Sequence, residues 1–362
     1  MPIREESFRI GCGRYVQGAG YVMKLGEEVA RLGTSPLVVG GETALSLTRE
    51  KIVSALFPFC DKYEFITHTG TCNEEAAKRI AEYARTHGYD VIVGVGGGVL
   101  MDFAKLCSHF AKIPVVNLPT SSATCAAYTP LSVRYTPEGR TVGSLHFKRE
   151  VDAVVVDTEI IAAEPTRLFL SGVFDALAKF VEIKQRFRED MDEYPMGLDY
   201  AFALAKRSFD ILNAKTERCI ADMARGDVTF DVENVIFTAV AVPGIISGIA
   251  RGSNQTALGH KFYEATRFFF PESSAPYLHG EIVGVGLLLQ NMFNGEEENN
   301  ALVLSLMEKY GMPRSIRDVG AAADASTLEK YYEKLKDSSA IDDSNAEECE
   351  RLHACLEKLW KI

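Results

Sequence analysis

The stretch VIVGVGGGVLMDFAK, residues 91–105, combines a strand pattern, a cluster of glycines and a helix pattern. Its first part is a run of valine and isoleucine that predicts a buried strand, and its last part has helical spacing. Between them lie Gly94, Gly96, Gly97 and Gly98. Such glycines allow either a tight turn and nothing more, or a close approach of the backbone to a ligand. Both interpretations predict a strand, a sharp turn and a helix.

Strand and helix patterns alternate on both sides of this stretch. We predict strands over 35–41, 63–68, 90–96, 113–120 and 152–161, and helices from about 42, over 74–88 and over 100–112. Thr71 and Glu74 have the spacing of a capping box before the second of these helices. Residues 131–145 predict a hairpin over the turn Thr136-Pro137-Glu138-Gly139. The alternation as a whole predicts a parallel sheet with helices on both faces.

The pattern changes after about Pro165, where most runs have apolar residues at helical spacing. Residues 197–215 and 232–250 are examples. We therefore expect two domains, an α/β domain with a parallel sheet over residues 1–162 and an all-α domain over residues 163–362. The cleft between two such halves is the natural place for a ligand.

The composition is that of an ordinary soluble globular protein, with 47% hydrophobic and 25% charged residues. The net charge of −11 disfavours nucleic acid and anionic membranes as partners, because both attract a basic face. No uninterrupted apolar run approaches the length of a bilayer crossing, and the N-terminus MPIREESFRIGCG lacks the apolar core of a signal peptide. Eight cysteines without a CxxC pair indicate reduced thiols, so we expect a cytoplasmic protein.

Two neighbouring strand ends carry residues suited to a nucleotide. In a parallel sheet, ligands bind beyond the carboxyl ends of strands, and residues 96–98 lie at such an end, directly before a helix. Backbone N–H groups there can meet a pyrophosphate. The spacing is not the dinucleotide fingerprint, because Val99 occupies the third glycine position. Asp102 in the helix, and the hydroxyl-rich PTSSAT (119–124) after the next strand, favour a nucleotide over a plain turn.

Three residues of the helical half form a candidate metal site. Asp175 has apolar neighbours, where a carboxylate is costly to bury unless it is paired or bound to a cation. His260 and His279 each begin or interrupt an apolar run, where a lone histidine is usually a packed core or surface residue. Their spacing matches no local metal motif such as HExxH. One carboxylate with two imidazoles still suits a catalytic divalent site with an open position.

Five motifs occur here in the order seen in the iron-containing alcohol dehydrogenase superfamily, across roughly residues 5–320. They are GVGGGVLMDFAK (94–105), LPTSSATCAAYTPLSVRYTPEG (118–139), SGVFDALAKFVE (171–182), ALGHKFYEA (257–265) and YLHGEIVGVG (277–286). The chain most resembles the glycerol dehydrogenase branch. The resemblance implies NAD(P)(H) in the cleft and a divalent metal, with zinc expected first and iron or nickel as alternatives. It also implies a small-molecule substrate, an alcohol interconverted with its carbonyl compound, and a homo-oligomer.

The resemblance assigns roles to particular positions of this sequence. The metal ligands, through which catalysis would act, become Asp175, His260 and His279. The spacing between the two histidines is slightly longer here, with RFFFPESS (267–274) as the expected insertion. The cofactor contacts become Gly97, Gly98, Val99 and Asp102 around the pyrophosphate, and Thr120, Ser121, Thr129, Leu131 and Tyr135 along the rest of the molecule.

Two positions depart from the glycerol dehydrogenase pattern. Those enzymes have an Asp in a Ser-Thr-Asp triplet that contacts the polyol, whereas this chain has Ala123-Thr124-Cys125, which places Cys125 in the expected substrate pocket. A thiol is a poor acceptor for substrate hydroxyls. The stretch ATCAAYTPLSV (123–133) instead resembles the hydroxycarboxylate dehydrogenase A subgroup, which reduces 2-oxo acids with NADPH. We therefore expect a 2-hydroxy acid and its 2-oxo acid as substrates, with glycerol as the alternative.

The second departure concerns the cofactor. NAD-specific relatives tend to have an Asp at the end of the first strand of the sheet, where this chain has Gly41. Loss of that carboxylate removes a repulsion against a 2′-phosphate, although Glu42 next to it acts in the opposite sense. The balance leans slightly to NADP.

Two other functions fit the same architecture. Sugar-phosphate cyclases such as dehydroquinate synthase share it, with NAD and a metal, but need a cluster of basic residues around a substrate phosphate. The short polar stretches of this chain do not show that cluster. A non-catalytic nucleotide-binding protein is the third reading, and the presence of all three candidate metal ligands argues against it.

Overall fold

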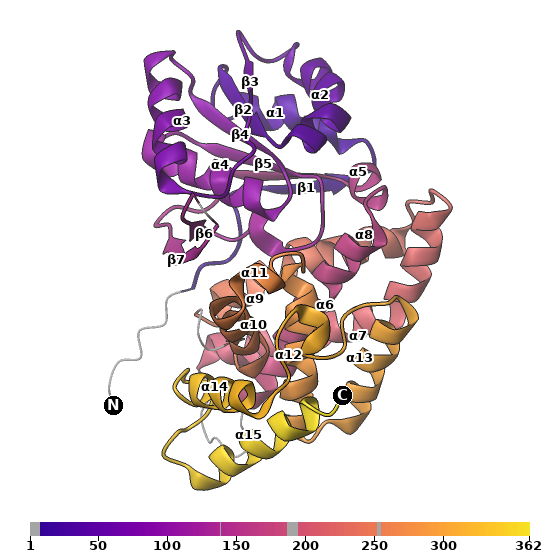
Figure 1. The fold of residues 1–362 in the computed structure, drawn as a ribbon. Helices are drawn as coiled ribbons and strands as arrows, with labels where there is room; N and C mark the ends of the chain where they lie inside the picture. The colour runs from indigo at the N-terminus through magenta and orange to yellow at the C-terminus, as the bar shows by residue number, and fades with distance from the viewer. Residues whose placement is uncertain (1–7, 138, 187–194, 252–254) are drawn as a thin grey trace. The chain divides into compact units, whose positions relative to one another are not determined.

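A computed structural model describes residues 8–137, 139–186, 195–251 and 255–362 (Figure 1). Its strands are β1 (Tyr15–Gly18), β2 (Pro36–Gly40), β3 (Glu64–Thr67), β4 (Val91–Gly96), β5 (Val115–Pro119), β6 (Leu131–Tyr135), β7 (Thr141–His146) and β8 (Ala153–Asp157). Its α-helices are α1 (Leu25–Ala30), α2 (Glu42–Leu56), α3 (Glu74–Thr86), α4 (Gly98–Ala111), α5 (Thr158–Ala162), α6 (Thr166–Arg186), α7 (Met196–Ala224), α8 (Phe230–Val240), α9 (Val242–Ile249), α10 (Leu258–Phe269), α11 (Pro271–Ser274), α12 (His279–Asn294), α13 (Glu297–Lys309), α14 (Ala325–Lys336) and α15 (Ala346–Leu359). Short 3-10 helices are η1 (Tyr21–Lys24), η2 (Cys125–Ala127) and η4 (Arg317–Val319).

A parallel sheet organises the first half of the chain. Within the described residues it has six strands in the order β1-β8-β5-β4-β2-β3. The chain runs outward from β2 to β3 and then returns to the other side of β2 to form β4. Val93 and Val95 of β4 share a core with α1 and α2, while Gly94 lies against α4. Because alternate residues of a strand point to opposite faces, helices cover both faces of the sheet.

Gly94 sets the distance between α4 and the sheet. A Cβ at this position would lie 2.5 Å from the Cβ of Ala104 and 2.9 Å from Oδ1 of Asn117. A larger side chain would therefore push α4 away from β4, because protein interiors are close-packed. The first glycine of the cluster serves packing, and the turn is made by the glycines that follow it.

The predicted α/β half with a parallel sheet, followed by helices, is confirmed by this arrangement. The hairpin is also confirmed, as the antiparallel pair β6–β7. Glu138 in its expected turn lies outside the described residues.

Two local predictions are wrong, and both errors concern helix caps. The strand predicted over 152–161 ends at Asp157, because the carboxylate of Asp157 accepts hydrogen bonds from the first N–H groups of α5. Asn73, and not Thr71, caps α3, because the side chain of Asn73 accepts a hydrogen bond from the N–H of Ala76. In both cases a short polar side chain meets N–H groups that a helix end leaves unpaired.

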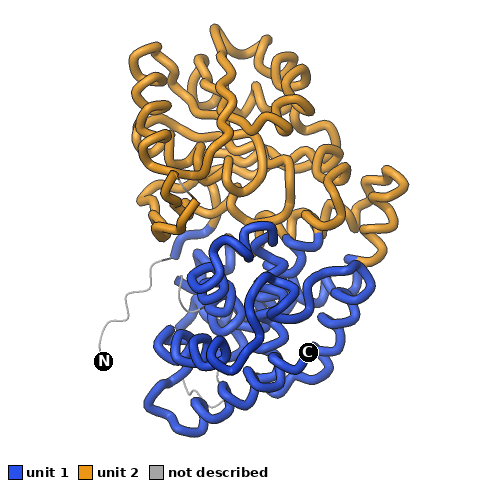
Figure 2. Tube along the Cα trace, viewed as in Figure 1, with its two compact units in different colours: residues 1–10, 170–216, 245–362 blue, residues 11–169, 217–244 orange. Residues whose placement is uncertain are grey.

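The chain forms two compact units (Figure 2). The α/β unit comprises Gly11–Phe169 and Glu217–Gly244, and the helical unit comprises Leu170–Thr216 and Ile245–Ile362 with the residues up to Ile10. The border expected at residue 162 does not coincide with this division, since the units separate inside α6 and α8 belongs to the α/β unit. The ring of Phe237 in α8 packs against that of Tyr15 in β1, with 5.5 Å between centroids. The side chain of Gln17 in β1 also donates a hydrogen bond to the backbone oxygen of Glu233.

Glycines allow the helices of the helical unit to pack closely. A Cβ on Gly286 of α12 would collide with the backbone oxygen of Gly259 in α10. A Cβ on Gly280, at the start of α12, would collide with the backbone oxygen of Ser171 in α6. The first turn of α12 therefore lies against α6, and the body of α12 lies against α10.

One run of the described residues, Phe230–Ile249, is long and apolar enough to cross a membrane by length and composition alone. The run contains Asp231 and Glu233, so it is not an uninterrupted apolar run of the kind that the sequence analysis excluded. The run is divided at Ala241 into α8 and α9, and 61% of its most apolar window is buried inside the protein. A single buried run of this kind is also typical of a core helix.

Candidate functional site

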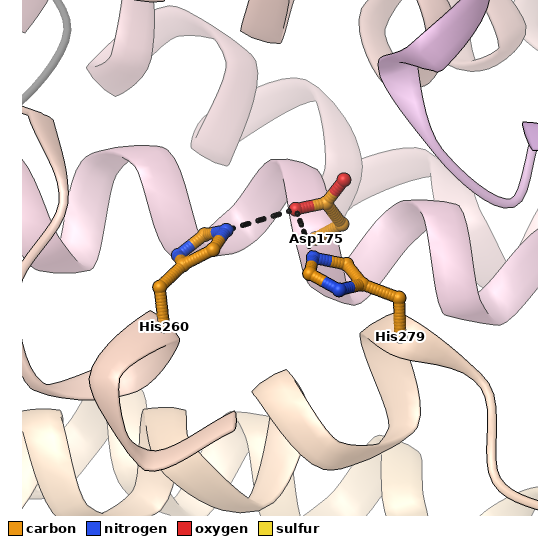
Figure 3. Close-up of side chains that lie close together, drawn as sticks. All are labelled: Asp175, His260 and His279. Atoms are coloured by element: carbon orange, nitrogen blue, oxygen red, sulfur yellow. Dashed lines mark ion pairs between the residues drawn. The ribbon is translucent and has the colours of Figure 1, made fainter. Parts of the chain in front are cut away.

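The structure brings Asp175, His260 and His279 together (Figure 3). Asp175 comes from the middle of α6, His260 from the first turn of α10, and His279 is the first residue of α12. One ligand atom from each residue lies within 4.8 Å of the others. The expected insertion at 267–274 contains the end of α10 and all of α11, so it lengthens the path between the histidines without separating their rings.

The distances from Asp175 to the two histidines match those that a single divalent ion requires. Nε2 of His260 lies 3.3 Å and Nε2 of His279 lies 3.5 Å from the same atom, Oδ1 of Asp175. Two ligand atoms that are each about 2.1 Å from a tetrahedral ion lie about 3.4 Å apart. Carboxylate oxygen and imidazole nitrogen are also ligands that zinc and its neighbours accept. The residues present therefore fit a divalent metal.

Two further charged residues of α6 belong to this site, and the sequence analysis did not identify them. Lys179 and Glu182 follow Asp175 by four and seven residues, so all three lie on one face of the helix. Each of the three is at most 4% exposed. Charged residues at helical spacing inside the apolar DALAKFVE are the signal that could have found them, because each needs a partner when buried.

Glu182 is the residue that contacts a candidate ligand directly. Its Oε2 lies 2.5 Å from Nδ1 of His260. Its Oε1 accepts hydrogen bonds from the backbone N–H groups of Ala257, at 2.9 Å, and of His260, at 2.8 Å. One fully buried carboxylate thus holds both the ring and the backbone of His260.

The charges of these residues depend on each other. Burial disfavours a charged ring at His260, but the carboxylates of Glu182 and Asp175 together outweigh burial and raise the pKa of His260 to about 9. Burial likewise opposes a charged Asp175, yet His279 and His260 hold the pKa of Asp175 well below its usual range. A metal ion therefore competes with a proton for Nε2 of His260, because only a neutral imidazole can be a ligand.

The predicted nucleotide positions gather at one edge of the sheet. Gly41, Gly97 and Thr120 follow the carboxyl ends of β2, β4 and β5, which are neighbouring strands. The N–H of Gly41 donates to the backbone oxygen of Val95, and the N–H of Thr120 donates to that of Gly96. Successive strands are added on one side of β2 up to β3, and on the opposite side from β4 onward. Doubly wound sheets bind their ligands at such a switch point between neighbouring parallel strands.

The N-terminus of α4 fits an anion. Gly97 is the N-cap residue, the first turn has no acidic residue, and among the described residues no side chain caps it. A Cβ on Gly97 would meet nothing within 4 Å, whereas a Cβ on Gly98 would lie 2.7 Å from Oγ1 of Thr124. Val99 is 45% exposed beside them. The free first turn and the helix dipole favour a phosphate group here, so the residues fit the pyrophosphate of NAD(P).

Asp102 has a more enclosed environment than the resemblance implies. Its Oδ1 lies 2.8 Å from Nζ of Lys105, and its Oδ2 accepts a hydrogen bond from the N–H of Val133. Lys105 also donates to the backbone oxygens of Thr129 and Leu131. The buried pair of Asp102 and Lys105 therefore holds the backbone of Thr129 and Leu131, two other predicted cofactor contacts, against α4. A contact between Asp102 itself and the cofactor stays a prediction.

The remaining predicted positions lie on the loop after β5 and on β6. Ser121 follows β5, Cys125 begins η2 and Tyr135 ends β6. The loop is held by Glu164, whose carboxylate accepts hydrogen bonds from the backbone N–H and the hydroxyl of Ser122. Burial raises the pKa of Glu164 to about 7, against the effect of the Ser122 hydroxyl. No local pattern could have identified Glu164, because its partner lies 42 residues away along the chain.

Comparison with known proteins shows to which family this chain belongs. The family model for iron-containing alcohol dehydrogenase matches residues 12–158. A glycerol dehydrogenase of Thermotoga maritima is 31% identical over 343 residues, which cover 90% of this chain and 89% of the relative. The chain belongs to the iron-containing alcohol dehydrogenase family.

Two further proteins that are similar to this chain bear on its branch within the family. Hydroxycarboxylate dehydrogenase A of Escherichia coli K12 is 29% identical over 259 residues, which cover 70% of this chain and 69% of the relative. The crystal structure of a probable glycerol dehydrogenase from Sinorhizobium meliloti 1021 superposes with a TM-score of 0.81 at 25% identity, over 99% of both chains. The predicted superfamily and its glycerol dehydrogenase-like branch are thereby confirmed.

Proposed function

We propose that this chain is a metal-dependent, NAD(P)-linked dehydrogenase that interconverts a small polyol such as glycerol with its carbonyl product. One observation carries the proposal: Oδ1 of Asp175 lies at the spacing of a tetrahedral divalent site from Nε2 of both His260 and His279. Relatives that match most of this chain bear the name glycerol dehydrogenase. They support a polyol better than the 2-hydroxy acid that the triplet at 123–125 led us to expect.

The residues of the site have complementary tasks in this proposal. Asp175, His260 and His279 would hold a divalent metal that would supply Lewis-acid chemistry, and NAD(P) would supply hydride transfer. With neutral imidazoles, the charges of Asp175, Glu182 and Lys179 sum to one negative charge beside a divalent cation. The resulting net positive site favours negative charge on a substrate oxygen. The first turn of α4 would hold the pyrophosphate and so orient the cofactor.

A 2-hydroxy acid and its 2-oxo acid are the second candidate substrates, and Cys125 is the observation that favours them. The loop after β5 has this thiol where a polyol-binding carboxylate would be expected from the resemblance. The similarity to hydroxycarboxylate dehydrogenase A supports the same substrates.

Three finer expectations stay predictions. Gly41 is the N-cap residue of α2, and the exposed Glu42 is the first residue of that helix. The slight preference for NADP over NAD therefore stays a prediction. Zinc is the metal expected first, and a homo-oligomer is the expected state in solution.

Absorbance at 340 nm with NADH, and separately with NADPH, tests the proposal. The substrates are dihydroxyacetone, a set of 2-oxo acids and simple aldehydes for reduction, and glycerol for oxidation, each with and without added Zn²⁺. We expect turnover of glycerol and dihydroxyacetone that needs the metal and falls by roughly a thousand-fold in Asp175→Ala. Glu28→Gln is the control, because Glu28 is a buried glutamate paired with Arg14 and Arg31 in the α/β unit.

The other outcomes separate the alternatives. Turnover confined to 2-oxo acids would replace the first substrate class with the second. A cyclic product without net change in NAD(P)H would favour a cyclase. Unchanged turnover in Asp175→Ala would overturn the metal-dependent mechanism.

A further inference from the structure

We infer that Glu182 is a positioning residue that fixes the tautomer of His260 and so presents Nε2 of His260 to the metal. The inference rests on the metal site of the proposed function. Oε2 of Glu182 lies 2.5 Å from Nδ1 of His260, while Nε2 of the same ring faces Asp175. A carboxylate only accepts hydrogen bonds, so Nδ1 must carry the hydrogen. In a neutral ring, Nε2 then has the lone pair that a metal requires.

The second oxygen of Glu182 fixes the backbone from which the ring extends. Oε1 accepts hydrogen bonds from the N–H groups of Ala257 and His260. These groups lie at the start of α10, where the N-cap residue Ala257 has no side chain that could cap the helix. Glu182 therefore replaces a local cap from a distance of 78 residues along the chain. The ring and its backbone are held by the same rigid carboxylate, which restricts where Nε2 can point.

The other histidine ligand has a different environment. The ring of His279 packs edge-on against that of Tyr263, with 4.3 Å between centroids, and its Nε2 faces Asp175. Within the described residues, no second carboxylate forms an ion pair with His279. The two candidate ligands are thus not equivalent, and a change at Glu182 acts on His260.

The replacement Glu182→Gln tests the role of the carboxylate without removing the helix cap. The amide oxygen of glutamine can still accept from the two backbone N–H groups, but the amide nitrogen then presents hydrogens to Nδ1 of His260. This favours the tautomer with hydrogen on Nε2, which cannot bind a metal. We expect zinc affinity, measured by competition with a chromophoric chelator, to fall by about 10- to 100-fold.

Two controls separate positioning from general damage. Glu28→Gln removes another buried carboxylate far along the chain and should leave zinc affinity within about two-fold of that of the unaltered protein. Circular dichroism establishes that Glu182→Gln is folded. A folded Glu182→Gln protein with unchanged zinc affinity would overturn the inference and leave the proposed function intact.

A measurement on the unaltered protein does not depend on any variant. The chain has seven histidines, so selective ¹⁵N labelling gives few ring signals to assign. In the zinc-loaded protein, we expect the ¹⁵N shifts of His260 to show hydrogen on Nδ1 and the metal on Nε2. Metal on Nδ1 of His260 would overturn the inference. Failure of the unaltered protein to bind zinc would instead overturn the proposed metal site, and this inference with it.

Discussion

A fully buried glutamate, Glu182, and a partly buried one, Glu164, have opposite pKa shifts, because their neighbours differ. Burial opposes ionisation of both. Glu182 faces the ring of His260, and the charge of His260 lowers the pKa of Glu182 despite burial. Glu164 faces the hydroxyl and the N–H of Ser122, which cannot offset burial, so its pKa rises to about 7. The partner, and not burial alone, decides the charge of a buried carboxylate.

Glu164→Gln should change how stability depends on pH. The folded-state pKa of Glu164 lies above the unfolded value of 4.5, so the folded state binds the extra proton between these two values. The favourable contribution of the Glu164 carboxyl to the free energy of unfolding is therefore complete below about pH 4.5, and it is lost as the pH rises toward 7. Glutamine keeps the acceptor oxygen without a charge. We expect the stability of the glutamine variant, relative to the protein with glutamate, to increase by about 3 kcal/mol from pH 4.5 to pH 8.

Thermal unfolding of both proteins at pH 5 and pH 8 measures this effect. The difference in Tm between Glu164→Gln and the unaltered protein should shift in favour of the variant at pH 8. An equal difference at both pH values would contradict the raised pKa.

The sequence could identify some residues of the site but not others. The candidate ligands Asp175, His260 and His279 could be predicted from motifs that resemble those of a known family, because a divalent metal would select those residue types. Glu182 and Glu164 follow only from the fold, since each contacts a partner that is distant along the chain. Their roles depend on tertiary contacts, which residue type and local spacing do not encode.

At the level of elements, the contact between α10 and α12 determines the spacing of the two histidines. Each histidine lies in the first turn of its helix, and the helices meet where Gly286 faces Gly259. Gly286→Ala should separate the helices, because the added Cβ meets backbone atoms that cannot rotate away. We expect a loss of about 1–3 kcal/mol in stability together with weaker zinc binding.

Gly284→Ala is the matched control on the same helix. There the closest atom to the added Cβ is the terminal methyl of Met307, at 2.8 Å, which is the flexible end of a side chain. Zinc titration and thermal unfolding of both variants measure the difference. Equal behaviour of the two variants would show that the backbone contact does not position the histidines.

The elements themselves were largely predictable from periodicity, and the exceptions occur at their ends. Residues 158–161 contain isoleucines typical of a strand, yet Asp157 caps them as a helix. Thr71 and Asn73 both have side chains able to cap α3, and tertiary contacts decide between them. The hydroxyl of Thr71 instead donates to the backbone oxygen of Thr136 in the hairpin.

At the level of the whole molecule, metal binding should stabilise one unit more than the other. All three candidate ligands lie in the helical unit. A ligand that binds only the folded state adds about 2.7 kcal/mol of stability at a hundred times its Kd. We therefore expect removal of the metal by a chelator to lower the Tm of the helical unit.

Differential scanning calorimetry with zinc and with chelator tests this expectation. If the two units unfold separately, only the transition of the helical unit should shift. Asp175→Ala should lose the zinc dependence, because it removes the oxygen that both rings share. A zinc-dependent shift that persists in this variant would place the metal elsewhere.

The division into units was less predictable than the sheet. The apolar face of α8 indicates that the helix is buried, but periodicity does not specify the partner on which it packs. Its contacts with β1, through Tyr15 and Gln17, assign α8 to the α/β unit although it follows α7 in the helical part of the sequence.

The common face of Asp175, Lys179 and Glu182 also limits how this sequence can change in length. Successive residues of an α-helix are rotated by about 100° around its axis. One residue inserted or deleted between 175 and 182 would keep Asp175 at the candidate metal site but turn Glu182 away from His260. In related sequences, one apolar residue of this interval can replace another, but the spacing of seven residues between Asp175 and Glu182 must be kept.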